Sequence, residues 1–141
     1  MSKLLQRLSD ASKSGVYRAP STDAILDATQ GSTLQVARID LAGATGKDAL
    51  MERVARAMRF PQWFGGNWDA LEDCLTDLSW SNAGGHVLLI EGGAEMSSDE
   101  RGVFIDILAA VAVWWADRRR PFFAVFLEGP PTLRELYKPR R

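Results

Sequence analysis

The stretch that decides the fold is FPQWFGGNWDALEDCLT, residues 60–76. Pro61 ends the helical pattern that comes before it, and the aromatic residues and glycines that follow are typical of a loop. Asn67 is a good N-cap for a new helix. Beyond it the apolar residues recur at helical spacing: Trp68, Leu71, Leu75 and Leu78. The stretch therefore predicts an aromatic loop that leads into an amphipathic helix.

The polar side of the same helix is acidic. Asp69 and Asp73 are four residues apart, Glu72 lies beside them, and Asp77 follows one turn later. Like charges at this spacing share a face and destabilise a helix by a few tenths of a kcal/mol each, on the order of 0.2–0.5. No Lys or Arg between residues 61 and 100 relieves them. The acidic side of a helix is usually just exposed to solvent. Here the uncompensated charge indicates instead a surface that binds a basic partner.

The loop before the helix strengthens that interpretation. Trp63 and Phe64 stand beside Gly65 and Gly66, directly ahead of the acids. Aromatic anchors next to charged groups that have no local partner are typical of the centre of a protein interface. We therefore expect the loop and the helix to act together in binding.

Outward from this stretch, hydrophobic patterns predict the remaining elements. We expect strands over Thr33–Leu41, His86–Glu91 and Phe122–Leu127, and helices over Lys47–Phe60 and Asp99–Arg118. The run HVLLIE is continuously apolar, as in a strand that is covered on both faces. Helices that alternate with strands in this order predict an α/β fold with a small three-stranded parallel sheet packed by helices.

The two ends of the chain are predicted to be additions to that domain. Residues 1–32 are expected to form an N-terminal extension, with a short helix within Ser2–Ser12 and one turn of helix around Ala24–Ala28. Residues 33–128 form the predicted domain. Residues 129–141 are a C-terminal tail that begins at a Pro-Pro pair and ends in basic residues.

Composition limits the partners. The chain has 141 residues, enough for one domain with a real core, and a formal charge of -1. This near-neutral total conceals an acidic segment between two basic flanks, a distribution that bears on partners rather than on fold. The near-neutral total charge argues against direct nucleic-acid binding.

No apolar run is long enough to span a membrane, and one cysteine, Cys74, without a signal peptide favours a cytoplasmic protein. The same Cys74 is expected to be packed rather than reactive.

Catalytic functions find little support in the residues. His86 is the only histidine, and a lone histidine at the start of an apolar strand is more often a surface or edge residue than a general base. No Ser-His-Asp arrangement and no glycine-rich phosphate motif can be assembled. Carboxylates alone could hold a metal ion or act as an acid/base pair, but a hydrolase is the least favoured hypothesis. We expect no enzyme, no cofactor and no metal site.

Residues 60–76 resemble the signature of the barstar family, small intracellular inhibitors of secreted bacterial ribonucleases. That pattern has an apolar residue and Pro, an aromatic pair, Gly-x-Asn, an Asp-Ala-Leu run and an Asp-Cys-Leu ending. The resemblance extends over about Thr33 to Glu128. It implies a three-stranded parallel sheet, and a second helix that blocks a ribonuclease active site together with the loop before it.

By position, the resemblance also implies roles. Asp73 falls on the acid that enters the phosphate pocket of the enzyme, and Asp69 on a second acid that pairs with an enzyme Arg or Lys. Trp63 falls on an aromatic residue that packs over the catalytic histidine, and Asn67 matches a family Asn. The expected partner-binding set is Trp63, Gly65, Gly66, Asn67, Asp69, Glu72, Asp73 and Asp77.

The chain departs from the family pattern at three places. Glu72 stands where many members have Trp, and Trp63 replaces a Tyr. A further family acid in the long helix falls near Trp115, and Asp117 could replace it only after a shift of register. These differences concern the identity of the target more than the mode of binding. The alternative hypothesis is therefore a module of the same fold whose basic partner is not a nuclease.

Overall fold

Five parallel strands form one sheet in the computed structural model, which describes residues 2–62 and 64–138. Along the sheet the order is β2-β3-β4-β1-β5. The strands are β1 (Gly15–Ala19), β2 (Leu34–Leu41), β3 (Gly85–Gly92), β4 (Phe122–Leu127) and β5 (Arg134–Glu135). The predicted strands β2, β3 and β4 are all present, but the prediction of a three-stranded sheet was wrong.

The two unpredicted strands lie outside residues 33–128. β1 pairs with β4 in parallel register, from Gly15 opposite Phe123 to Ala19 opposite Leu127. β5 pairs with the other side of β1 over two residues. Both segments are too short to carry a periodic pattern of their own. They are strands because β4 and then β1 present unpaired backbone groups beside them.

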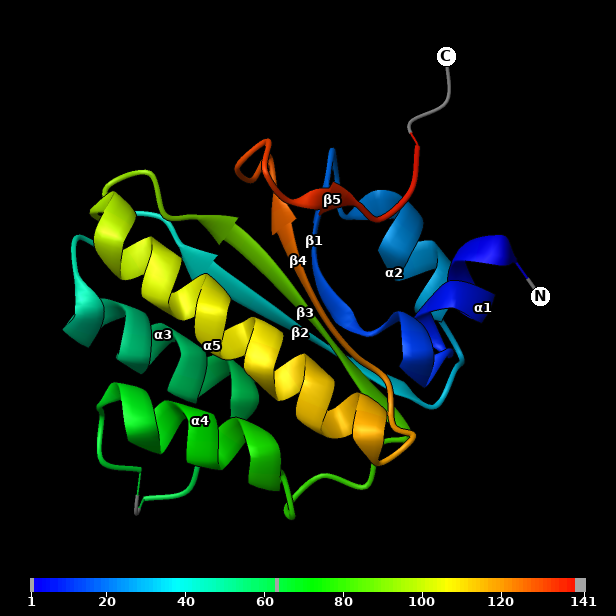
Figure 1. The fold of residues 1–141 in the computed structure, drawn as a ribbon, viewed down its shortest axis with the longest axis horizontal. Helices are drawn as coiled ribbons and strands as arrows, with labels where there is room; N and C mark the ends of the chain where they lie inside the picture. The colour runs from blue at the N-terminus through cyan, green and yellow to red at the C-terminus, as the bar shows by residue number, and fades with distance from the viewer. Residues whose placement is uncertain (1, 63, 139–141) are drawn as a thin grey trace.

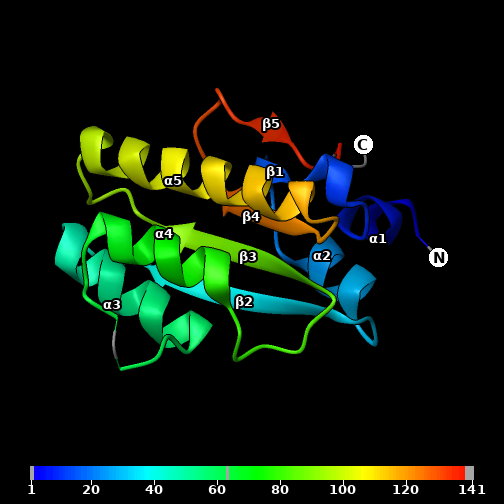
Figure 2. The same ribbon diagram turned by 60° about the horizontal axis from the view of Figure 1, so that its bottom comes forward.

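Helices cover both faces of this sheet. They are α1 (Lys3–Leu8), α2 (Asp23–Thr29), α3 (Lys47–Met58), α4 (Trp68–Asp77) and α5 (Ser98–Asp117), and a 3₁₀ turn η1 spans Ala11–Lys13. Figures 1 and 2 show α3, α4 and α5 on one face, and α1 and α2 on the other. In the described part of the chain, no helix is long and apolar enough to cross a membrane.

The core has two parts because the central strands are buried on both faces, as predicted for β3. Leu88 and Ile90 of β3 pack in the cluster under α3, α4 and α5. Val87 and Leu89 point to the other face and pack with Tyr17 of β1 and with α1 and α2. The N-terminal segment therefore covers apolar surface that residues 33–128 would leave open to water.

α4 lies in the outer helical layer, against α5 (Figure 2). Its inner face is fully buried through Leu71, Cys74 and Leu75, and Trp68 is half-buried against the same core. Its other face is turned to solvent. This position leaves one complete side of α4 available to a partner.

Candidate partner-binding surface

Four carboxylates occupy the solvent side of α4: Asp69, Glu72, Asp73 and Asp77. All four residues are exposed. Within residues 2–62 and 64–138, none of the four side chains forms an ion pair or accepts a hydrogen bond. The structure thus brings the predicted acids onto one face and leaves their charges uncompensated.

Three other acids of the cation-free segment have structural partners: Glu91, Glu95 and Glu100. Glu91 pairs with Arg38 across β2 and β3, with 2.9 Å between Oε1 and Nη2. Glu95 accepts a hydrogen bond from the Gly43 amide, and Glu100 accepts one of 2.8 Å from the Lys47 amide at the start of α3. The fold uses these acids internally, whereas the described residues provide no such partner for the acids of α4.

The N-terminal end of α4 is fixed by a cap. The Asn67 side chain accepts a hydrogen bond from the Ala70 amide at 2.7 Å, as expected of the N-cap. Gly66 has a φ of 71°, a backbone conformation that favours glycine. Asp69 lies in the first turn, where the positive end of the helix dipole favours a carboxylate. Asn67 and Gly66 therefore set the direction in which α4 leaves the loop.

The loop that leads to α4 rests on packed aromatic rings. The rings of Phe60 and Phe64 meet edge to face with centroids 4.9 Å apart, and Trp80 packs edge-on against Phe60 at 6.1 Å. A hydrogen bond from the Phe64 amide to the Pro61 carbonyl closes the turn between them. The predicted contact residue Trp63 lies outside the described residues.

Trp115 holds the C-terminal half of α4. Its indole N–H donates a buried hydrogen bond of 2.8 Å to the Leu75 carbonyl. Trp115 is only 7% exposed, whereas its neighbour Trp114 is half-buried and carries the Arg118 guanidinium 3.4 Å from its ring centroid. One of the two adjacent tryptophans is thus buried and the other is half-buried. The residue at the position of the additional family acid serves here as an internal anchor for α4.

Cys74 is buried on the inner side of α4, and the prediction that it is packed is confirmed. Burial raises the pKa of its thiol, and the negative charges of Asp77 and Asp73 raise that pKa further. The thiolate, which is the reactive form, is therefore disfavoured.

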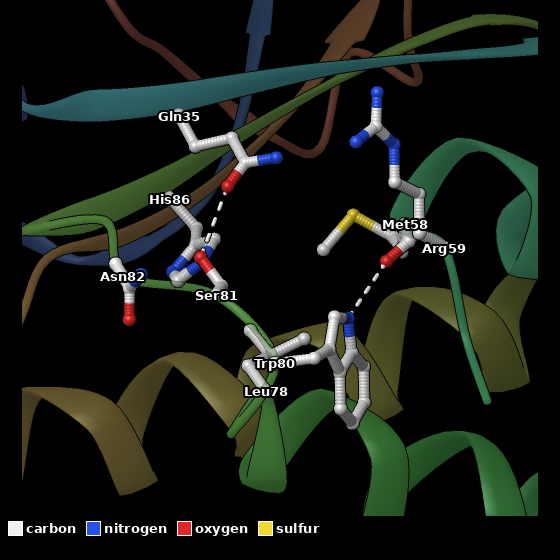
Figure 3. A pocket seen from close by; sticks show the side chains of 8 residues that line it. All are labelled: Gln35, Met58, Arg59, Leu78, Trp80, Ser81, Asn82 and His86. Carbon is white, nitrogen blue, oxygen red and sulfur yellow. Dashed lines mark hydrogen bonds between the residues drawn. The ribbon is translucent and has the colours of Figure 1, made fainter.

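A small pocket lies beside the C-terminal end of α4 (Figure 3). Its residues come from β2, the ends of α3 and α4, the segment before β3 and the start of β3: Gln35, Met58, Arg59, Leu78, Trp80, Ser81, Asn82 and His86. The Ser81 hydroxyl lies 3.0 Å from Gln35 Oε1 and 3.0 Å from His86 Nε2. The Trp80 indole N–H donates to the Met58 carbonyl. These bonds tie the segment after α4 to α3 and to the sheet.

His86 corrects one expectation. It is 4% exposed on β3, which lies between β2 and β4, so it is neither a surface nor an edge residue. Burial lowers its pKa to about 4, and the charge of Arg120 acts in the same direction. The histidine is therefore neutral at pH 7. Hydrogen bonds connect His86 to Ser81 and Ser81 to Gln35, so the third group is an amide and not the carboxylate of a Ser-His-Asp triad.

Comparison with known protein families decides the relationship. The model of the Barstar family, described as Barstar (barnase inhibitor), matches residues 34–127, which is more than half of the chain. The chain belongs to the Barstar family. In this barstar-family protein the match runs from β2 to β4 and includes the loop and α4. A comparison with curated proteins gave no match.

The fold also resembles a larger solved structure. The Aeropyrum pernix ORC2 protein, solved in ADPNP-ADP complexes, aligns with a TM-score of 0.54 and 15% sequence identity. The alignment covers 88% of this chain and 37% of that chain. At this identity the likeness concerns the fold alone, and the barstar-family chain spans well under half of the length of the protein that it matches.

The structure brings together most of the residues that sequence reasoning chose. Asn67 and the four acids of α4 lie on the solvent side of one helix and its cap, and Gly65 is exposed just before them. Sequence reasoning did not find Trp80 and Ser81, which support the loop and the end of α4. Their contacts cross from one element to another, so no local pattern could have indicated them.

Proposed function

We propose that this barstar-family protein is a ribonuclease inhibitor in which α4 and the loop at residues 60–67 cover the active site of the enzyme. The observation that carries the proposal is the set of four exposed carboxylates, which have no partner among the described residues. A face of like charges destabilises the free protein slightly. That cost is offset when a basic partner supplies the missing counter-charges.

The chemistry of a ribonuclease suits this surface. Such an enzyme binds the phosphates of RNA with cationic side chains, and a row of carboxylates can occupy the same positions. Complementary potentials also accelerate the encounter of the two proteins. Because the cap at Asn67 and the bond from Trp115 to Leu75 hold α4 in place, little conformational entropy is lost on binding.

Roles within the surface follow from the family resemblance. In this proposal Asp73 enters the phosphate pocket, Asp69 pairs with a second cation, and Glu72 and Asp77 extend the negative face. Gly65 and Gly66 carry no side chain, so the partner can approach the backbone ahead of the helix. Trp63 is proposed as the aromatic contact over the catalytic histidine.

The test is binding by Asp73→Ala. The probes are barnase, which the family description names, and any basic nuclease encoded by a neighbouring reading frame. Titration calorimetry and inhibition of RNA cleavage would be measured. We expect a loss of roughly 2–5 kcal/mol of binding free energy, at least about 30-fold in affinity, because a cation of the enzyme is left unpaired. Glu91→Gln, which removes a charge that already has a partner, should bind like the wild type. Wild-type affinity for Asp73→Ala would refute the proposal.

A second candidate is a binding module of the same fold whose basic partner is not a nuclease. Glu72 and Trp115 favour it, because both stand where the family pattern has another residue. In that case Asp73→Ala would still weaken the complex, but the wild-type protein would leave RNA cleavage by the probe nucleases unchanged. The cleavage assay therefore distinguishes the two candidates.

A further inference from the structure

The two basic flanks of the sequence meet in the fold. β5 pairs with β1, so that Arg134 lies opposite Tyr17. The Arg134 guanidinium carbon is 4.7 Å from the centroid of the Tyr17 ring, and that of Arg7, from α1, is 5.3 Å from the same centroid. Two guanidinium groups from opposite ends of the chain therefore lie beside one aromatic ring. Figure 1 shows this region, α1 and β5, away from α4.

Neither guanidinium has a counter-charge among the described residues. In the part of the chain that the structure describes, neither Arg7 nor Arg134 forms an ion pair, and the buried Nε of Arg7 has no hydrogen-bond acceptor. Their neighbour Arg18 shows the contrast, since it pairs with Glu135 at 3.2 Å and donates a hydrogen bond of 2.8 Å to the Leu133 carbonyl. A buried N–H group without an acceptor is costly.

The surface beside Arg7 is hollow. A pocket there is lined by Lys3, Leu4, Arg7, Leu136 and Tyr137. Lys3 thus adds a third cation at the rim. An adjoining hollow shares Lys3, Leu4 and Tyr137 and also contains Asp23 and Asp27, whose carboxylates lie on its α2 side. Arg134 is not among the residues that line these two hollows. A Cβ at Gly15 would stand 3.2 Å from Arg134 Nη2, so the absence of a side chain at Gly15 leaves room for the guanidinium.

We propose that Arg7 and Arg134, with Lys3 at the rim, form a binding site for a phosphate-type oxyanion. The planar guanidinium presents paired N–H donors that match the oxygens of phosphate. A single oxyanion in contact with both groups would supply the negative charge that neither has among the described residues. The ligand is either inorganic phosphate or the phosphate group of a nucleotide. This site is independent of the proposed ribonuclease contact, because it lies on other elements and has the opposite charge.

The test is a titration of the full-length protein with sodium phosphate, and separately with adenosine monophosphate, at an ionic strength held constant with chloride. Calorimetry would give the affinity, and the phosphorus NMR signal would report the bound group. We expect saturable binding that Arg134→Gln weakens about 10-fold, because each hydrogen bond to a charged group contributes a factor of that order. Arg7→Gln should do the same, and Arg7→Lys should retain part of the affinity.

The matched control is Arg101→Gln, in α5 on the other side of the sheet, which should leave the affinity unchanged. Arg134 is exposed on a two-residue edge strand, so its variant tests the site even if Arg7→Gln does not fold. Binding of both ligands supports the proposal. If adenosine monophosphate binds more tightly than phosphate, the ligand is the phosphate group of a nucleotide. If the two affinities are equal, the ligand is inorganic phosphate. Phosphate that acts no differently from chloride, or an equal loss in Arg101→Gln, would overturn the proposal.

Discussion

Replacing Asp73 by Asn should stabilise the free protein, although the same change is expected to weaken its proposed complex. Asp73 has a like charge four residues before it, at Asp69, and another four residues after it, at Asp77. Each such pair destabilises a helix by about 0.2–0.5 kcal/mol. Asn and Asp have similar helix propensities, so the substitution isolates the charge. No described group pairs with the Asp73 carboxylate, and nothing favourable is lost.

The expected gain is therefore about 0.4–1 kcal/mol in the free energy of unfolding. For a chain of this size, that corresponds to an increase of about 1–4 °C in the melting temperature. Urea denaturation and calorimetry at low salt would measure it. Because the charges are exposed to solvent, the gain should shrink at 1 M salt, where screening acts within about 3 Å.

Two neighbouring substitutions make the prediction sharper. Asp77→Asn should also stabilise, since it removes one repulsive pair and an acid at the negative end of the helix dipole. Asp69→Asn should gain little or nothing, because the lost interaction with the N-terminal dipole, about 0.3–1 kcal/mol, offsets the relieved repulsion. Glu91→Gln should lose up to about 1 kcal/mol with its ion pair to Arg38. A decrease in stability for Asp73→Asn would refute the reasoning, because it would mean that the carboxylate has a partner within the folded chain.

Three further outcomes are expected. Trp115→Phe should lower stability by roughly 1–3 kcal/mol in urea, because the buried Leu75 carbonyl loses its donor; an unchanged midpoint would mean that α4 is anchored elsewhere. The pKa of His86 falls from 6.5 to about 4 on folding, so the unfolded chain binds more protons between these values. Its contribution to stability is complete above pH 6.5 and is lost as the pH falls towards 4, and His86→Gln should flatten that decline in urea titrations. A chain of residues 33–128 alone should bind a hydrophobic dye and self-associate in gel filtration, because the face of the sheet under α1, α2 and β1 is uncovered; a monomer as stable as the full chain would contradict this.

Local patterns were sufficient for the elements from β2 to β4. α3 and α4 have apolar stripes at helical spacing and clear ends, at Pro61 and at the Asn67 cap, and the structure has them within two residues of the predicted limits. β4 spans Phe122–Leu127 as predicted. The acidic side of α4 was equally visible, because the spacing of the acids along a helix fixes which of them share a face.

Tertiary structure decided which acids have partners. In the sequence, Glu91 and Glu100 lie in the same segment without Lys or Arg as the acids of α4. The partners of Glu91 and Glu100 lie 53 residues away along the chain, at Arg38 and Lys47. Only packing could separate the internally used carboxylates from those left to solvent.

The sequence by itself determined the helices and strands that have strong periodicity, the cap at Asn67 and the negative face of α4, because these depend on neighbours within one or two turns. Only the tertiary structure decided that the sheet has five strands, that His86 is buried and neutral, and that Arg7 and Arg134 both lie beside the Tyr17 ring. The physical reason is the same in each case. Strand pairing and burial depend on which distant segment of backbone lies next to a strand. The sequence of a strand of two or five residues does not indicate which segment that is.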